Sequence, residues 1–165
     1  MRLFISAGTD HHHFDRLMGW AGNWADAHPE DTVVVQHGTT PPPKGVEAAE
    51  LFRRDEMRAQ IESADVVVIS GGPGGVMDVR ATGRRPIVVA RRHALGEHVD
   101  DHQHAFARHL ADTGLAVCVE TEDEFAAAID DARARPEQWR VAPDTEPPSG
   151  IARIGQLIDE LVWRN

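Results

Sequence analysis

The chain has 165 residues, 41% hydrophobic and 27% charged, which fits one folded domain with its own core. Its formal net charge of −10 argues against nucleic-acid phosphate as the main partner. The single cysteine, Cys118, permits no internal disulfide, and its apolar surroundings favour a buried structural thiol. No apolar stretch is long enough to span a bilayer and no signal peptide is recognisable, so we expect a cytoplasmic chain.

Strands and helices are predicted to alternate from residue 2 to about residue 134. Short β-branched runs indicate strands buried on both faces, and apolar residues at helical spacing indicate helices that pack on a sheet. We therefore predict an α/β fold, a three-layer Rossmann-like domain with a mostly parallel sheet. The predicted strands are 2–7, 32–37, 48–53, 66–69, 85–89 and 115–119.

The first predicted strand ends in the turn Gly8-Thr9, which would place backbone N–H groups at the carboxyl end of that strand. The run His11-His12-His13 follows. Adjacent histidines on one helix or strand cannot all point at one ion, and a zinc site needs further ligands that converge. We therefore predict exposed loop histidines and no metal site, with metal binding as the alternative.

Glycines directly follow the buried run 66–69, at Gly71, Gly72, Gly74 and Gly75. Without a Cβ atom, this loop lets backbone N–H groups approach a ligand. The next helix would direct its positive end at the same point, which favours a phosphate or diphosphate. Asp78 falls early in that helix, within reach of a ribose. The pattern predicts a nucleotide site, and a plain tight turn is the alternative.

Arg91 and Arg92 follow the next strand and are expected at the ligand end of the sheet. Either arginine is suited to pair with a diphosphate, and the alternative is a flexible, solvent-exposed loop.

The segment after these arginines ends in Asp100-Asp101-His102-Gln103. Asp100 or Asp101 is predicted to cap a helix that runs to about residue 111, with His102 and Gln103 in its first turn near the same ligand. The alternative is that this segment only caps the helix and packs the loop.

Towards the C-terminus, Thr121 and Glu124 form a capping-box pattern that opens a helix to about Ala134. We divide the chain into a nucleotide-binding domain, 1–142, and a Pro-rich linker with a C-terminal amphipathic helix, 143–165. That helix is predicted either to dock on its own domain or to pack on a partner subunit.

The segment 64–114 closely resembles the nucleotide-sugar half of family 28 glycosyltransferases, a group that includes the C-terminal domain of MurG and the free-standing Alg13-like subunits. That family carries an Ala-Asp pair before a buried strand, a Gly-rich loop, an acidic residue in the next helix, a basic-Pro-apolar strand and a loop ending in DHQ. Here these parts are Ala64-Asp65, Gly71 to Gly75, Asp78, Arg85 to Val89 and Asp100 to Gln103. Further matches to Alg13-like proteins are Gly8, Thr9, Phe14, Asp15, Leu17, Gln36 and Gly38.

This resemblance implies a single half of a GT-B fold that binds a UDP-sugar. Asp78 stands where the family usually has Glu, and Gly75 where it usually has Thr or Ser. The implied substrate-binding residues are Gly8, Thr9, Gly71, Gly72, Gly74, Gly75, Asp78, Arg91, His102 and Gln103.

The resemblance also implies the donor-binding subunit of a heterodimeric inverting glycosyltransferase in polysaccharide or lipid-linked sugar synthesis. Such an enzyme works only with an Alg14-like, membrane-associated partner that supplies the acceptor site and the catalytic base. The catalytic residue is therefore unknown from this chain. No cofactor is expected besides the UDP-sugar substrate, and membrane association is expected only through the partner.

Two other functions remain as alternatives. The glycine loop also resembles the PGGxGTxxE loop of LOG-type phosphoribohydrolases, which act on nucleoside monophosphates, although the Thr and Glu of that loop are absent here. The other alternative is a nucleotide-binding regulatory module without catalysis.

Overall fold

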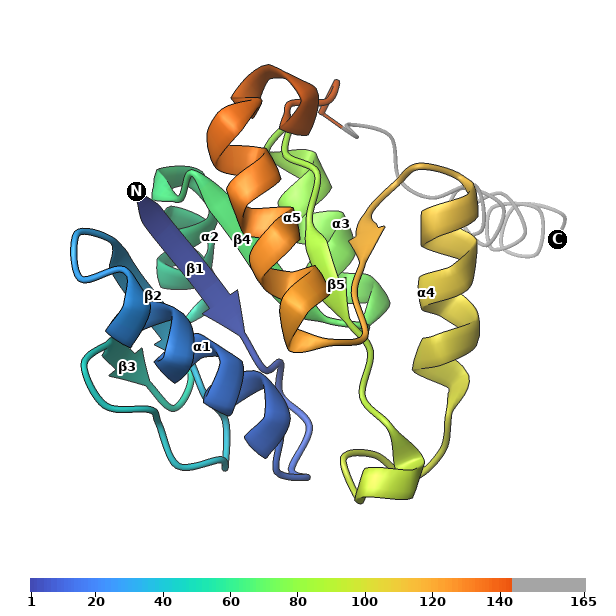
Figure 1. Ribbon diagram of the computed structural model, residues 1–165. Coiled ribbons are helices and arrows are strands. Elements are labelled where there is room, and N and C mark those ends of the chain that lie inside the picture. The colour runs from blue at the N-terminus through green and yellow to red at the C-terminus, as the bar shows by residue number, and fades with distance from the viewer. Residues whose placement is uncertain (144–165) are drawn as a thin grey trace, which may run out of the picture.

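The computed structural model describes residues 1–143, in which strands and helices alternate along the chain (Figure 1). The strands are β1 (Arg2–Ser6), β2 (Thr32–Gln36), β3 (Glu47–Ala49), β4 (Val66–Ser70), β5 (Ile87–Val89) and β6 (Val117–Cys118). The α-helices are α1 (Asp15–Ala27), α2 (Arg54–Ser63), α3 (Pro73–Ala81), α4 (His102–Asp112) and α5 (Glu122–Ala134). Two short 3-10 helices are η1 (His93–Leu95) and η2 (Pro136–Trp139).

The six strands form one sheet in the order β3-β2-β1-β4-β5-β6, and each pair of neighbours is parallel. The predicted parallel α/β sheet is therefore confirmed. This strand order is that of a doubly wound sheet, whose direction of winding reverses between β1 and β4. In such sheets ligands bind outside the carboxyl ends of the strands at the point of reversal.

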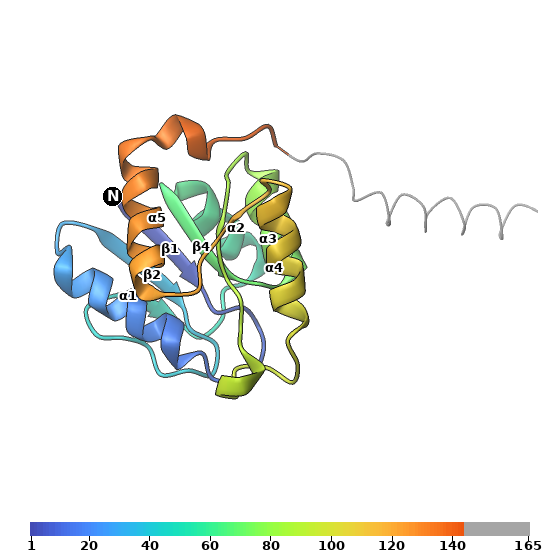
Figure 2. The same ribbon diagram turned by 45° about the vertical axis from the view of Figure 1, so that its right-hand side comes forward.

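Helices cover both faces of the sheet, which gives the predicted three layers (Figure 2). Strand residues alternate between the two sides, so that Leu3 and Ile5 face one layer and Phe4 faces the other. The first layer is formed by α1 and α5 with side chains that include Leu17, Trp20, Trp24, Phe125 and Ile129. The second is formed by α2, α3 and α4 with Ile61, Val76, Val79, Ala107 and Leu110.

Two strands are each three residues shorter than predicted. The predicted strand 48–53 is the three-residue β3, because the chain leaves the ladder after it and Phe52 N donates to the Gln36 side chain at 3.1 Å. The Phe52 ring packs edge-on against Phe4, with centroids 6.0 Å apart, which draws this segment over the sheet. The predicted strand 115–119 pairs only at Val117 and Cys118.

The capping box at the start of α5 is confirmed, since Thr121 Oγ1 accepts from Glu124 N at 3.2 Å. Cys118 is half-buried and its Sγ donates to Ala107 O at 3.0 Å. Burial raises the pKa of this thiol to about 11, which fits the structural role predicted for it. The predicted linker and C-terminal helix lie outside the described residues beyond Pro143. Within residues 1–143, no helix combines the length and apolar character needed to cross a membrane.

Candidate functional site

A cavity of about 610 Å³ opens at the carboxyl ends of β1 and β4, at the point of reversal in the sheet. Residues from the β1–α1 loop, the β4–α3 turn, α2, α3 and the start of α4 line it. Predicted site residues on its wall are Gly8, Thr9, Gly72, Gly74, Gly75, Asp78, Arg91 and Gln103. The cavity thus lies where a doubly wound sheet binds its ligand, and its volume is typical of small-molecule sites.

The two loops on which the nucleotide-site prediction depends are in contact. A Cβ atom added to Gly71 would lie 3.1 Å from Oε1 and 3.2 Å from Cβ of Gln103. Both distances are shorter than ordinary van der Waals contact, so a side chain here would displace Gln103, and Gly71 serves the packing between the β4–α3 turn and α4. Gly71 itself is buried and is not part of the cavity wall.

Position 8 requires a glycine for two reasons, its backbone conformation and the closeness of Ser70. Its φ of 80° lies in the left-handed region, and a Cβ atom there would lie 2.7 Å from Ser70 Oγ. Its amide N–H donates to Ser6 Oγ at 3.2 Å. The β1–α1 loop is thereby held against the end of β4, which places Gly8 and Thr9 on the cavity wall.

The predicted glycine loop is shorter than expected. Helix α3 begins at Pro73, so only Gly71 and Gly72 form the turn, and Gly74 and Gly75 lie in the first turn of the helix. Proline favours this first position because its ring fixes φ at a helical value and it has no N–H to leave unpaired. The first amides of α3 have no intrahelical acceptor and lie at the cavity. Asp78, exposed and further along the same helix, is also on the wall.

Gln103 lies in the first turn of α4 and is 5% exposed. Its Oε1 accepts from Arg91 N at 3.2 Å, which fixes the amide and leaves Nε2 without a hydrogen-bond partner among residues 1–143. His102 is not on the cavity wall; its imidazole is about half exposed and pairs with Asp100 through Nδ1. Asp101 is the N-cap residue, but its carboxylate accepts from His93 N instead of capping the helix.

Arg91 is only 1% exposed, so the alternative of a solvent-exposed loop is wrong for this residue. Its Nη1 donates to the carbonyls of His12 at 2.8 Å and Glu97 at 2.9 Å, and its Nη2 to that of Ala7 at 2.8 Å. Burial lowers the pKa of this guanidinium, against the opposing effect of Asp10 and Glu97. Arg91 therefore joins the β1–α1 loop to the β5–α4 segment at the base of the cavity.

Sequence reasoning missed a buried ion pair beside this arginine. Arg16 of α1 makes two hydrogen bonds to the Glu97 carboxylate, at 3.0 and 2.8 Å, and Glu97 is 4% exposed. Glu97 also accepts from Arg92 N at 2.8 Å. A signal was available, because Arg16 precedes Trp20 by one helical turn and so lies at the edge of the buried face of α1, where a charged side chain needs a partner.

Three charged residues of the cavity wall were also missed. Asp10 follows the Gly8-Thr9 turn, and Arg54 and Arg58 lie on α2. Partial burial raises the pKa of Asp10, but hydrogen bonds from the amide and ring of His12 outweigh it, so that the net shift is downward. The cavity therefore combines two carboxylates, Asp10 and Asp78, with basic side chains on its α2 side.

This fold is a Rossmann-like domain with a cavity at the reversal of its sheet, and comparison with known proteins specifies the family. Residues 24–154 match the glycosyltransferase family 28 C-terminal domain. The chain belongs to this family. The match begins within α1, so it does not cover the Gly8-Thr9 turn.

Two curated relatives carry the same name, UDP-N-acetylglucosamine--N-acetylmuramyl-(pentapeptide) pyrophosphoryl-undecaprenol N-acetylglucosamine transferase. The protein from Burkholderia cenocepacia is 38% identical over 77 residues, which is 47% of this chain and 20% of the relative. The protein from Paracidovorax citrulli is 36% identical over 85 residues, which is 52% of this chain and 23% of the relative. The match therefore spans about a fifth of each relative.

Solved structures of glycosyltransferases share the fold. MurG of Acinetobacter baumannii superposes with a TM-score of 0.62 at 19% identity, over 97% of this chain and 50% of that one. The calicheamicin glycosyltransferase CalG4 gives a TM-score of 0.62 at 19% identity, over 99% of this chain and 42% of that one. The domain is thus one Rossmann-like half of a GT-B fold, resembling the C-terminal half of MurG.

Proposed function

We propose that this chain binds the UDP-sugar donor of an inverting glycosyltransferase. The observation that carries the proposal is that the start of α3, Asp78 and Gln103 all lie on the wall of the same cavity. These groups come from two segments of the chain, one after β4 and one at the start of α4. If the glycines formed only a tight turn without a ligand, the two segments would have no reason to meet at one cavity. The family to which the domain belongs and the volume of the cavity, about 610 Å³, support a nucleotide-sized ligand.

Each group has a distinct proposed role. The first amides of α3, aligned with the positive end of the helix, would bind the diphosphate. Asp78 would accept hydrogen bonds from the ribose hydroxyls. The Nε2 of Gln103 is the donor that would orient the sugar or a phosphate oxygen. Arg91 is not available for this role, because its Nη1 and Nη2 are bonded to carbonyls. Arg54 on the wall would meet the charge of the ligand instead, since the other arginine of α2, Arg58, is paired with Glu62.

The proposed reaction is transfer of the sugar with inversion. The oxygen of an acceptor hydroxyl attacks the anomeric carbon as the bond from that carbon to the β-phosphate oxygen breaks. The acceptor proton passes to a base outside this chain, and UDP departs with the electron pair. This chain would stabilise the charge on the departing diphosphate through fixed N–H donors that need no rearrangement.

We further propose that a separate, Alg14-like membrane-associated protein supplies the acceptor site and the base, as in Alg13-like systems. The donor half of such an enzyme is the part that this chain resembles. Polysaccharide or lipid-linked sugar synthesis is the corresponding process.

Calorimetry with UDP and with AMP tests the donor proposal. We expect UDP to bind at least about tenfold more tightly, a difference of about 1.4 kcal/mol. Equal or tighter binding of AMP would contradict the proposal and favour a phosphoribohydrolase. The partner proposal is tested by sugar transfer with the chain alone and together with the product of its neighbouring gene. Transfer only by the pair supports it, and UDP binding with no transfer by the pair would favour a regulatory module.

A further inference from the structure

A cluster of imidazoles and carboxylates joins the β1–α1 loop to the β5–α4 loop beside the cavity. Asp10 Oδ1 contacts His12 Nδ1 at 2.6 Å, and Asp10 Oδ2 contacts Nε2 of His98 at 3.3 Å. The His11 and His12 rings lie 4.1 Å apart. Neither the proposed donor site nor the packing of the core accounts for this concentration of metal-binding side chains.

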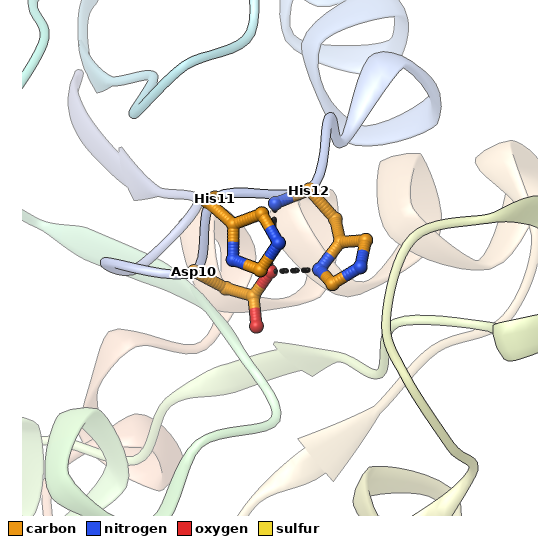
Figure 3. A group of neighbouring side chains, drawn as sticks. All are labelled: Asp10, His11 and His12. Carbon is orange, nitrogen blue, oxygen red and sulfur yellow. Dashed lines mark hydrogen bonds and ion pairs between the residues drawn. The ribbon is translucent and has the colours of Figure 1, made fainter.

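We propose that Asp10, His11 and His12 form a site for a divalent transition-metal ion of the zinc class. One ligand atom from each of the three lies within 4.8 Å of the others (Figure 3). Two ligands at 2.0–2.1 Å from a tetrahedral zinc ion are roughly 3.3 Å apart, so small side-chain rotations bring the three into place. Two imidazoles and one carboxylate suit zinc, whereas calcium and magnesium prefer oxygen ligands alone.

The backbone explains how adjacent histidines converge. Residues 10–13 belong to neither a helix nor a strand, so the expectation that neighbouring side chains must diverge does not apply to them. His12 N donates to Asp10 Oδ1 at 2.8 Å, which folds the loop back on itself and brings the two side chains together. Figure 3 shows the Asp10 carboxylate beside both rings.

The ring nitrogens of His11 and the carboxylate of Asp10 are also available as metal ligands. The hydrogen bond of His11 within the described residues is made by its backbone carbonyl, with Thr39 Oγ1, so its ring nitrogens are free to bind an ion. His98, whose side chain is 11% exposed, contacts the second oxygen of Asp10 from the other loop. Ligating carboxylates are commonly held by such an outer hydrogen bond, which fixes their orientation.

His98, Asp100 and His102 form a second group of this kind. It is the weaker candidate, because the side chains of Asp100 and His102 are both more than half exposed, whereas those of Asp10 and His12 are about a quarter exposed. An ion on Asp10 would instead fix the β1–α1 loop, which carries Gly8 and Thr9. This proposal does not depend on UDP-sugar binding.

Calorimetry with zinc chloride on the untagged, chelator-treated chain tests the site, with magnesium chloride as the comparison ion. We expect one zinc ion per chain, no magnesium binding, and a rise in melting temperature with zinc. Asp10→Asn and His12→Ala should abolish both effects. The matched control is His13→Ala, since His13 belongs to the same run but lies outside the cluster; it should bind zinc as the unaltered chain does.

A second control separates the two groups of ligands. His102→Ala should leave zinc binding unchanged. The proposal is overturned if the unaltered chain binds no zinc, if His13→Ala loses binding as His12→Ala does, or if only His102→Ala loses it. Circular dichroism of each variant establishes that it is folded, and loss of zinc binding by a folded Asp10→Asn chain is the supporting result.

Discussion

Glycines at the candidate site serve three different physical purposes. Gly8 has a left-handed backbone, Gly71 allows Gln103 to approach the β4–α3 turn, and Gly74 leaves space that no protein atom fills. A Cβ atom added to Gly74 would meet nothing within 4 Å, although the residue lies on the cavity wall. The first two glycines are explained by the fold, whereas the fold does not require a glycine at position 74, where the open space would suit a ligand that approaches the helix backbone.

Gly74→Ala should therefore separate stability from binding. The substitution removes a glycine from a helix and should stabilise the chain by up to about 1 kcal/mol in urea unfolding. The new methyl group occupies ligand space, so calorimetry should show UDP affinity reduced about tenfold or more.

Gly19→Ala is the matched control, because Gly19 lies in α1, is exposed, and also has nothing within 4 Å of an added Cβ atom. It should raise stability in the same direction and leave UDP affinity unchanged. Unaltered UDP binding by Gly74→Ala would show that no ligand approaches this part of α3.

At the scale of elements, the site is made by the ends of strands and the beginnings of helices. β1 and β4 end side by side, and α3 and α4 begin there, so two positive helix ends lie near one cavity. Arg91 and the Arg16–Glu97 pair then fix the loops that follow β1 and β5. Because these groups are buried and bonded to one another, the loops are held in place without a ligand.

At the scale of the whole molecule, Asp31 joins segments far apart in sequence. Its side chain is fully buried and accepts from Trp24 Nε1 at 3.1 Å, Arg133 Nη2 at 2.5 Å and the Met1 ammonium at 3.0 Å. Burial raises the pKa of this carboxyl, but these partners outweigh it and lower the pKa below 3.8. Asp31 therefore ties α1 and the start of the chain to the end of α5.

This network predicts a specific dependence of stability on pH. A carboxyl whose folded pKa is depressed stabilises the fold above its unfolded pKa, and that contribution is lost as pH falls through the folded value. Asp31→Asn should cost about 1–3 kcal/mol of unfolding free energy near neutral pH. The difference between the two chains should narrow progressively below pH 3.8, as measured by urea unfolding at several pH values. A constant difference from neutral to acid pH would contradict this role for Asp31.

Much of this architecture could be predicted from local patterns. Runs such as Val66 to Ile69 predict buried parallel strands, and the Thr121 capping box gives the start of α5. The glycine turn after β4 and the segment Asp100 to Gln103 were both predicted at the carboxyl ends of the strands, where Gly72 and Gln103 line the cavity. The burial of Arg91 could not be predicted, because two of its three carbonyl acceptors, those of Ala7 and His12, come from a loop about eighty residues away in the sequence. The convergence of Asp10 with His98 was missed for the same reason, since it depends on tertiary structure alone.

The most direct test of the donor site is UDP calorimetry on two variants from different loops. Asp78→Ala removes the proposed ribose acceptor, and Gln103→Glu keeps the Oε1 that accepts from Arg91 N but replaces the donor Nε2 with an anionic oxygen. Asp130→Ala, an exposed acid on α5 away from the cavity, is the control. We predict that both site variants weaken UDP binding by about tenfold or more and that the control does not. UDP affinity unchanged in Asp78→Ala and Gln103→Glu would contradict the conclusion that these two loops together bind the nucleotide.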